Sequence, residues 1–334
     1  MTTVELGTLI PPFPGMAVPA ALAAEQDGYD IALFPDSANL FGETFTQLAL
    51  VAAATDTIKI GTGVTNPITR HPATTAASIL SIQHASDGRA ILGVGRGDSA
   101  LGHIGMDYPA PMAVYEPYLR QVKAYLAGEE VDQNGFASRI RWLDQYDLPN
   151  VPLDMACSGP KTIAMAATST DRVSLALGAN PERLRWGIEI ARAAAEAAGR
   201  DPQSISIGAW INTTVDDDRA AAREAMRAFV AGFAHFQGMR GNAIDEQPDI
   251  LRPHSERLRT DYDTNMHGQA NAPHAQALDD EFIDWFSVAG PAPEVAERLR
   301  ELVDLGLDHV YLLGAMRPAS RAAFKADVMP TLRA

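Results

Sequence analysis

Residues 90–105, Ala-Ile-Leu-Gly-Val-Gly-Arg-Gly-Asp-Ser-Ala-Leu-Gly-His-Ile-Gly, join a short apolar run to a glycine-rich polar loop. The apolar run at 91–94 predicts a buried strand. Gly93, Gly95 and Gly97 occupy alternate positions, and glycine lacks the β-carbon that would keep a flat ligand or another stretch of backbone at a distance. The spacing is neither that of a dinucleotide fingerprint nor that of a P-loop. The stretch is therefore either an ordinary turn after a strand or one wall of a ligand site.

The same pattern, a short apolar run followed by a polar loop, recurs along the chain with helical segments mostly in between. We expect strands at residues 4–10, 31–34, 58–64, 91–94, 151–157, 172–177, 205–213 and 308–313. Because these runs are continuously apolar and do not alternate with polar residues, they indicate a parallel sheet that is buried on both faces. Eight such strands predict an α/β fold of the (β/α)8 TIM barrel type, with a doubly wound sheet as the alternative.

The length of 334 residues suits one barrel with insertions. We expect a single domain, 1–334, with excursions at about 128–148 and 236–290. The first is polar and glycine-containing and has the character of a mobile excursion. The second contains His254, His267 and His274, which we interpret as loop histidines. No two of them have the i, i+4 spacing of a helical metal site, so no metal is expected.

The charge balance and the cysteine content exclude several classes of protein. A net charge of −15, from 27 Lys and Arg against 42 Asp and Glu, argues against binding to nucleic acid or to an anionic membrane surface. The only cysteine, Cys157, cannot form an internal disulfide and suits a reducing compartment. The N-terminal residues do not resemble a signal peptide, and no apolar run approaches the length of a membrane span. We expect a cytoplasmic protein that acts on a small molecule.

Ser158-Gly159-Pro160-Lys161 follows the strand at 151–157 and begins a helix. The free N–H groups and the dipole at a helix N-terminus both favour an anion, so this segment is a candidate phosphate site. The alternative is an ordinary helix start with proline near its first position.

In a barrel, the polar residues that follow successive strands lie on one rim. The residues concerned are Asp36, Thr65, Arg96 to Ser99, and Ser158 to Lys161. Barrel enzymes hold their active sites at the rim formed by the C-terminal ends of the strands, so the shared location favours a ligand site over a set of unrelated turns.

Four segments of this rim resemble the bacterial-luciferase-like flavin and deazaflavin oxidoreductases. They are Asp36, residues 61–72 (Gly-Thr-Gly-Val-Thr-Asn-Pro-Ile-Thr-Arg-His-Pro), residues 92–98 (Leu-Gly-Val-Gly-Arg-Gly-Asp) and residues 156–161 (Ala-Cys-Ser-Gly-Pro-Lys). The likeness is greatest to the branch that uses the deazaflavin coenzyme F420, the methylenetetrahydromethanopterin reductase-like enzymes. It spans roughly residues 1–235 and returns at 288–294.

The resemblance implies an oxidoreductase that transfers a hydride between reduced F420 and a small organic acceptor with a C=C, C=N or C=O bond. It implies a non-prolyl cis peptide at Gly63-Val64, behind the ring system of the cofactor. The implied cofactor-binding residues are Asp36, Gly63, Val64, Thr65, Arg96, Gly97, Ser158, Gly159 and Pro160, and Lys161 is a plausible addition.

Three residues are candidates for catalysis. Asp98 lies beside Gly97 and is the first candidate for an acid, the alternative being that it caps the next segment. Asp36 is the second candidate, and His103, five residues beyond Asp98, is the third. Some members of the family place a histidine acid/base directly after the aspartate of strand two, whereas this chain has Ser37 there.

Two other functions remain open. The first is an FMN-dependent two-component monooxygenase supplied by a separate cofactor reductase, and the second is a non-catalytic flavin-binding barrel. The fold alone does not separate these alternatives. Because members of the family often pair through helices on one side of the barrel, we also expect a homodimer in which residues 45–55 and 72–86 pack between subunits.

Overall fold

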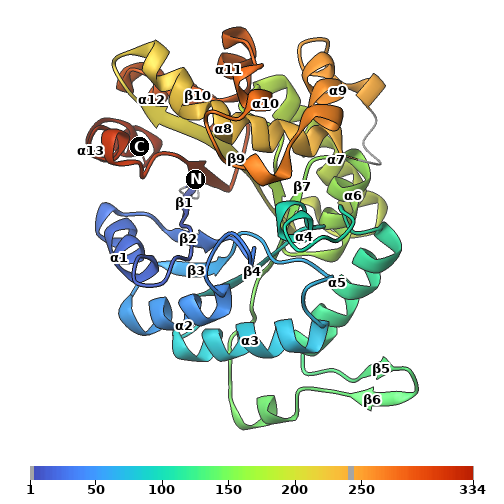
Figure 1. Ribbon diagram of the computed structural model, residues 1–334. Coiled ribbons are helices and arrows are strands. Elements are labelled where there is room, and N and C mark those ends of the chain that lie inside the picture. The colour runs from blue at the N-terminus through green and yellow to red at the C-terminus, as the bar shows by residue number, and fades with distance from the viewer. Residues whose placement is uncertain (1–3, 240–243, 334) are drawn as a thin grey trace. The chain divides into compact units, whose positions relative to one another are not determined.

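A computed structural model describes residues 4–239 and 244–333 (Figure 1). These residues form two compact units. The amino-terminal unit consists of residues 9–155 and 169–171, and the carboxy-terminal unit consists of residues 4–8, 156–168 and 172–333. Residues 1–3, 240–243 and 334 of the predicted domain lie outside the described residues. That the chain forms a single domain stays a prediction.

The amino-terminal unit contains four parallel strands and the helices that connect them. The strands are neighbours in the order β2 (Ile31–Phe34), β3 (Lys59–Thr62), β4 (Ala90–Val94) and β7 (Leu153–Cys157), of which residues 153–155 belong to this unit. Every residue of β2 and β4 is buried, as their continuous apolar sequences predict. The helices of this unit are α1 (Ala17–Asp27), α2 (Thr44–Ala54), α3 (Pro72–Ala85), α4 (Ser99–Gly102) and α5 (Met112–Leu126).

The carboxy-terminal unit repeats this alternation. Its parallel strands are neighbours in the order β1 (Glu5–Leu9), β11 (His309–Leu313), β9 (Ser206–Val215) and β8 (Arg172–Leu175). The main helices are α6 (Pro160–Ser169), α7 (Pro181–Ala197), α8 (Arg219–Gly238) and α12 (Ala292–Val303). After β11 come α13 (Pro318–Ala323), a π-helical turn (Phe324–Val328) and α14 (Met329–Arg333). All eight predicted strands are present, and the (β/α)8 barrel fold is confirmed.

A further short strand, β10 (Val288–Gly290), was not predicted. It pairs in parallel with the end of β9, from Thr213 to Val215. Three residues that include alanine and glycine give too short a pattern to be recognised in a sequence.

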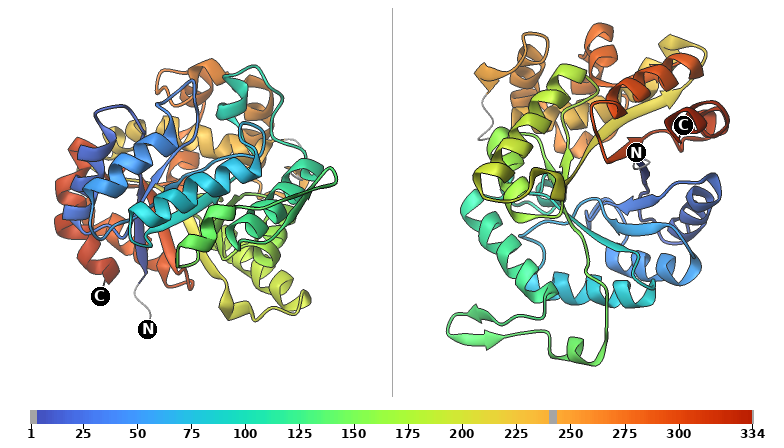
Figure 2. Two further views of the ribbon diagram at one scale, coloured as in Figure 1. Left: turned by 90° about the horizontal axis from the view of Figure 1, so that it is seen from below. Right: turned by 180° about the vertical axis from the view of Figure 1, so that it is seen from behind.

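The excursion at 128–148 contains a β-hairpin and is not an irregular loop. Strands β5 (Val131–Gln133) and β6 (Phe136–Ser138) pair antiparallel and are followed by a 3-10 turn at Arg141–Gln145. The two residues between the strands, Asn134 and Gly135, both have positive φ, which suits a tight hairpin turn. In Figure 1 and Figure 2 the hairpin extends beyond the end of α5.

The excursion at 236–290 is largely helical where it is described. It contains α9 (Arg252–Asp261), α10 (Pro273–Gln276) and α11 (Asp280–Phe286), which bury apolar residues against α8. The interpretation of His254 and His274 as loop residues is therefore wrong, since they lie in α9 and α10. The sequence of α9, Arg-Pro-His-Ser-Glu-Arg-Leu-Arg-Thr-Asp, buries only Ser255 and Leu258, so it shows little apolar periodicity.

No helix in the described residues combines the length and the apolar character that crossing a membrane requires.

Candidate active site

Asp36 directly follows β2 and is the centre of a polar network in the amino-terminal unit. Its side chain is 6% exposed. Thr65 Oγ1 donates a hydrogen bond to Asp36 Oδ2 (2.7 Å), and Arg70 donates from Nε to the same oxygen (2.8 Å) and from Nη2 to Oδ1 (3.3 Å). Arg70 also pairs with Glu43. Burial alone would lower the pKa of Arg70, but the hydrogen bonds and charges of Asp36 and Glu43 outweigh it and raise that pKa.

This network changes the interpretation of Asp36. Both of its carboxylate oxygens accept hydrogen bonds from a cation, so the geometry favours a positioning role over the release or uptake of a proton. Arg70 belongs to the Thr-Arg-His-Pro segment that resembles the family, but no sequence pattern pairs it with Asp36, which lies 34 residues earlier.

The loop after β3 contains the non-prolyl cis peptide at Gly63-Val64 that the resemblance implies. Neighbouring segments hold this loop on both sides. The N–H of Asp36 donates to the carbonyl of Val64 (3.4 Å), the N–H of Thr65 donates to the carbonyl of Gly93 (3.0 Å), and the N–H of Gly95 donates to the carbonyl of Thr65 (2.8 Å). The loops after β2, β3 and β4 therefore form one connected wall.

Close packing against this wall accounts for two of the three glycines. A β-carbon at Gly93 would lie 2.0 Å from the carbonyl oxygen of Thr62, and one at Gly95 would lie 2.6 Å from Cγ2 of Val64. Gly97 differs, because its φ of +82° is a conformation that residues with side chains rarely adopt. Gly93 and Gly95 thus leave room for atoms of the neighbouring strand and loop. The side chain of Val64 lies against Gly95, where a larger residue would displace it.

Asn66 is a candidate site residue that the sequence analysis missed. It is 1% exposed, and its Oδ1 accepts hydrogen bonds from the N–H groups of Ile68 and Thr69 (both 3.0 Å). Its Nδ2 is buried and has no acceptor within the described part of the chain. Leaving a buried donor unsatisfied costs about 1–3 kcal/mol, so this amide marks a place where a bound molecule can supply an acceptor. The available signal was its position directly after Thr65.

Arg96 is half-buried in the loop after β4. Its Nε donates to the carbonyl of Ala110 (2.8 Å), and the N–H of Ala110 donates back to the carbonyl of Arg96 (2.9 Å). Burial lowers the pKa of Arg96. These two bonds fasten the loop to the segment that precedes α5.

Asp98 and His103 lie at opposite ends of α4. The main-chain carbonyl of Asp98 accepts from the N–H groups of Leu101 and Gly102, whereas its side chain makes no capping hydrogen bond to this helix. The cap alternative is therefore wrong for the carboxylate. The carbonyl of His103 accepts from Asn39 Nδ2 (2.8 Å), and the ring Nε2 of His103 is buried with no hydrogen-bond partner among the described residues.

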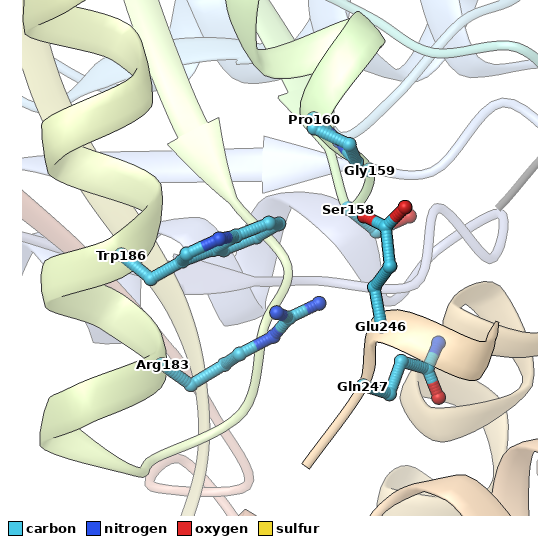
Figure 3. A pocket seen from close by; sticks show the side chains of 7 residues that line it. All are labelled: Ser158, Gly159, Pro160, Arg183, Trp186, Glu246 and Gln247. Carbon is cyan, nitrogen blue, oxygen red and sulfur yellow. The ribbon is translucent and has the colours of Figure 1, made fainter. Parts of the chain in front are cut away.

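The remaining predicted residues lie in the carboxy-terminal unit, where α6 begins at Pro160. Ser158 Oγ donates to the carbonyl of Phe236 (3.3 Å), and the carbonyl of Gly159 accepts from the N–H of Ile163 (2.9 Å). Lys161 is exposed on the first turn of α6. A pocket opens at this turn, and Figure 3 shows the side chains that line it: Ser158, Gly159, Pro160, Arg183, Trp186, Glu246 and Gln247.

Arg183 is the second site residue that the sequence analysis missed. It is the third residue of α7, whose capping residue Asn180 accepts a hydrogen bond from the N–H of Arg183 (2.9 Å). Its side chain is 7% exposed, and its guanidinium carbon lies 3.7 Å from the centre of the Trp186 ring. Burial lowers the pKa of Arg183 to about 10, so it is charged at neutral pH.

The predicted site residues thus form two clusters, one in each unit. Asp36, Gly63, Val64, Thr65, Arg96, Gly97, Asp98 and His103 belong to the amino-terminal unit, and Ser158, Gly159, Pro160 and Lys161 belong to the carboxy-terminal unit. In the described residues, no three His, Cys, Asp or Glu side chains are grouped as metal ligands.

Comparison with known proteins relates both clusters to one family. The family model described as luciferase-like monooxygenase matches residues 12–309. A 5,10-methylenetetrahydromethanopterin reductase of Methanolobus tindarius is 30% identical over 311 residues, covering 91% of this chain and 92% of that protein.

Solved structures have the same fold. The coenzyme F420-dependent tetrahydromethanopterin reductase from Methanopyrus kandleri superposes with a TM-score of 0.75 at 24% identity and covers 99% of both chains. An F420-dependent secondary alcohol dehydrogenase in complex with an F420-acetone adduct gives 0.78 at 20% identity and covers 100% of both chains. From its match to the family model and its identity to the Methanolobus reductase, the chain belongs to the luciferase-like monooxygenase family.

Proposed function

We propose that this protein is a coenzyme F420-dependent oxidoreductase that transfers a hydride between the reduced deazaflavin and a small organic acceptor with a C=C, C=N or C=O bond. The observation that carries the proposal is the 30% identity to a methylenetetrahydromethanopterin reductase along 91% of the chain. The identity of the acceptor is left to experiment.

Each cluster, considered by itself, offers groups that suit such a cofactor. Reduced F420 supplies a hydride when it is bound. In the amino-terminal unit, Val64 is held by Gly95 and would support the ring system, while Asn66 Nδ2 offers a buried donor to a polar atom of the ligand. Asp36 would position Thr65 through their hydrogen bond. In the carboxy-terminal unit, Ser158, Gly159 and Pro160 line a pocket at a helix N-terminus, which suits a phosphate.

We assign the proton transfer that accompanies hydride transfer to Asp98, with His103 as the second candidate. Asp98 lies beside Gly97 in the loop after β4, whereas both oxygens of Asp36 accept hydrogen bonds from Arg70. We expect Asp98→Asn to lower kcat about 100-fold, as is typical for the loss of a general acid, with the Kd for F420 unchanged. Asp107→Asn, a change at an exposed carboxylate in the same segment, is the matched control. An unchanged kcat in Asp98→Asn would remove this residue from catalysis, and His103→Gln would then be measured.

The family name supports a second candidate, an FMN-dependent two-component monooxygenase that receives reduced FMN from a separate reductase. Fluorescence titration of the purified protein with F420 and with FMN separates the two. We expect saturable quenching with F420 and none with FMN, and no consumption of oxygen when reduced cofactor is added. Binding of FMN alone would overturn the F420 assignment. Retention of F420 without turnover of any acceptor would favour the non-catalytic barrel.

We also propose that the protein is a cytoplasmic homodimer whose subunits pair through α2 and α3. Leu50 on α2 is 52% exposed, and an interface built on α2 would cover this apolar side chain. Light scattering should give a dimer mass for the native chain and a monomer mass for Leu50→Glu. Val114→Glu, which alters an apolar residue of α5 that is 41% exposed, should leave the dimer intact. A monomer mass for the native chain would contradict the proposal.

A further inference from the structure

We propose that Arg183, stacked on Trp186, and the N-terminus of α6 together form a binding site for the anion of a phosphate ester. The inference deepens the proposed function, and it rests on that function only for the identity of the ester. Neither the resemblance nor any relative's name assigns a role to Arg183.

The first observation is a buried cation without an internal partner. Arg183 is 7% exposed, its Nε has no hydrogen-bond acceptor, and no carboxylate in the described residues forms an ion pair with it. A buried charge is normally paired, because its removal from water is costly. The stack on Trp186 compensates only part of this cost, since a cation–π contact is weaker than the desolvation penalty of a buried charge. An anion supplied by a ligand would provide the missing partner.

The second observation is where this guanidinium points. Figure 3 shows the indole of Trp186 and the guanidinium of Arg183 lying one over the other, with both directed toward the turn formed by Ser158, Gly159 and Pro160. Pro160 has no N–H, and the N–H of Gly159 donates to Thr162 Oγ1 (3.3 Å), so the N–H groups of Lys161 and Thr162 are the ones that the first turn of α6 offers at the positive end of its dipole. A cation and a helix N-terminus therefore line the same pocket within one unit.

The chemistry of these groups selects the ligand. A guanidinium presents a planar fork of N–H donors that matches two oxygens of a phosphate, and a helix N-terminus offers main-chain N–H groups to a third. Gln247 already donates one N–H of its Nε2 to the carbonyl of Gln237 (2.8 Å), so at most its second amide N–H is available to an anion. The indole of Trp186 fixes the plane of the guanidinium in advance, so little side-chain entropy is lost when the anion binds.

One lining group opposes an anion. Glu246 is exposed, and its carboxylate lies on the far side of the pocket from Trp186 (Figure 3). It forms no ion pair with Arg183 in the described parts of the chain, and it is screened by solvent. Because the negative charge of Glu246 repels an anion, removal of this charge should tighten the binding of any anion next to Arg183.

The test measures binding of inorganic phosphate to the protein without cofactor, by calorimetry and by fluorescence of Trp186. We expect saturable binding to the native chain, at least about tenfold weaker binding to Arg183→Met, and intermediate binding to Arg183→Lys, which keeps the charge but loses the fork. Glu246→Gln should bind more tightly. Arg185→Met, two residues along α7 and exposed, is the matched control and should bind as the native chain does. Thermal melts establish that each variant is folded, and Trp186→Phe identifies the fluorescence signal.

A second arm identifies the source of the phosphate. F420 and its phosphate-free deazaflavin nucleoside are titrated into the native chain and into Arg183→Met. If the cofactor provides the ester, the variant loses affinity for F420 but not for the nucleoside, and inorganic phosphate competes with F420. If the substrate provides it, both affinities are unchanged and phosphate binds together with F420.

The proposal is overturned if inorganic phosphate binds the native chain and Arg183→Met equally, or binds neither. Failure of F420 to bind a protein that still takes up phosphate would remove the proposed function and leave the anion site standing.

Discussion

Replacement of Arg70 by methionine isolates the energy of the buried network around Asp36. The substitution removes two hydrogen bonds from a carboxylate that is 6% exposed and leaves Thr65 Oγ1 as its remaining side-chain donor. Removing one partner of a buried ion pair typically costs about 3–5 kcal/mol, because the other charge remains buried and uncompensated. Arg70 itself is 20% exposed, so we expect the lower end of that range. The corresponding fall in Tm is roughly 4–6 °C for a chain of this length.

The assay is urea unfolding of a double-mutant cycle made from Arg70→Met, Asp36→Asn and the double variant. We expect the double variant to be more stable than Arg70→Met alone, since it no longer buries an unpaired charge. In Asp36→Asn, Arg70 keeps Glu43 as a partner, so the loss of stability should be smaller than in Arg70→Met. If Arg70→Met lost less than about 1 kcal/mol, the pair would behave like an exposed salt bridge and the argument that it fixes Asp36 would fail.

Two further predictions concern the same unit. Gly95→Ala should weaken F420 binding and lower the free energy of unfolding by about 1–3 kcal/mol, because its β-carbon would lie 2.6 Å from Cγ2 of Val64. Adding Val64→Ala to the same chain should restore the stability. If the effects of the two substitutions simply added, the proposed contact would be contradicted. Burial raises the pKa of Tyr118 to about 12, although a hydrogen bond to Thr75 opposes this, so the folded chain keeps a proton that the unfolded chain loses above pH 10. Stability should therefore fall by about 2 kcal/mol as the pH rises from 10 to 12, and urea unfolding of Tyr118→Phe should lack this part of the pH dependence.

The strands could be predicted from the sequence because burial on both faces leaves a continuous apolar run. β2 was predicted with its observed bounds, since the run at 31–34 lies between Asp30 and Pro35. β9 extends two residues beyond its prediction, through Thr214 and Val215, because polar side chains near its end are buried by the tertiary structure. The helices of the 236–290 excursion could not be found, since few of their residues contribute apolar periodicity.

Some site residues could also be predicted from the sequence, and others could not. Asp36, Thr65 and Asp98 come within four residues of the ends of apolar strands, so the order of elements alone places them near strand ends. Arg70 could not be assigned a role, because its partners Asp36 and Glu43 lie 34 and 27 residues earlier in the chain. Arg183 belongs to the sequence Pro-Glu-Arg-Leu-Arg-Trp, which is typical of an exposed first helical turn, and Arg185 in the same turn is in fact exposed. Only packing in three dimensions distinguishes the two arginines.

Asp36 and Arg183 represent two different outcomes of burying a charge. The buried charge of Asp36 is stabilised by hydrogen bonds from Arg70 and Thr65 within the same unit. Asp36 therefore has a positioning role for the groups that it binds. Arg183 has no acidic partner in the described residues, so any energy gained by neutralising it is available to a ligand. Folding alone would favour an uncharged residue at position 183, because an apolar side chain could pack on Trp186 without the desolvation cost. The charge there is consistent with binding of an anion and not with stability of the ligand-free chain.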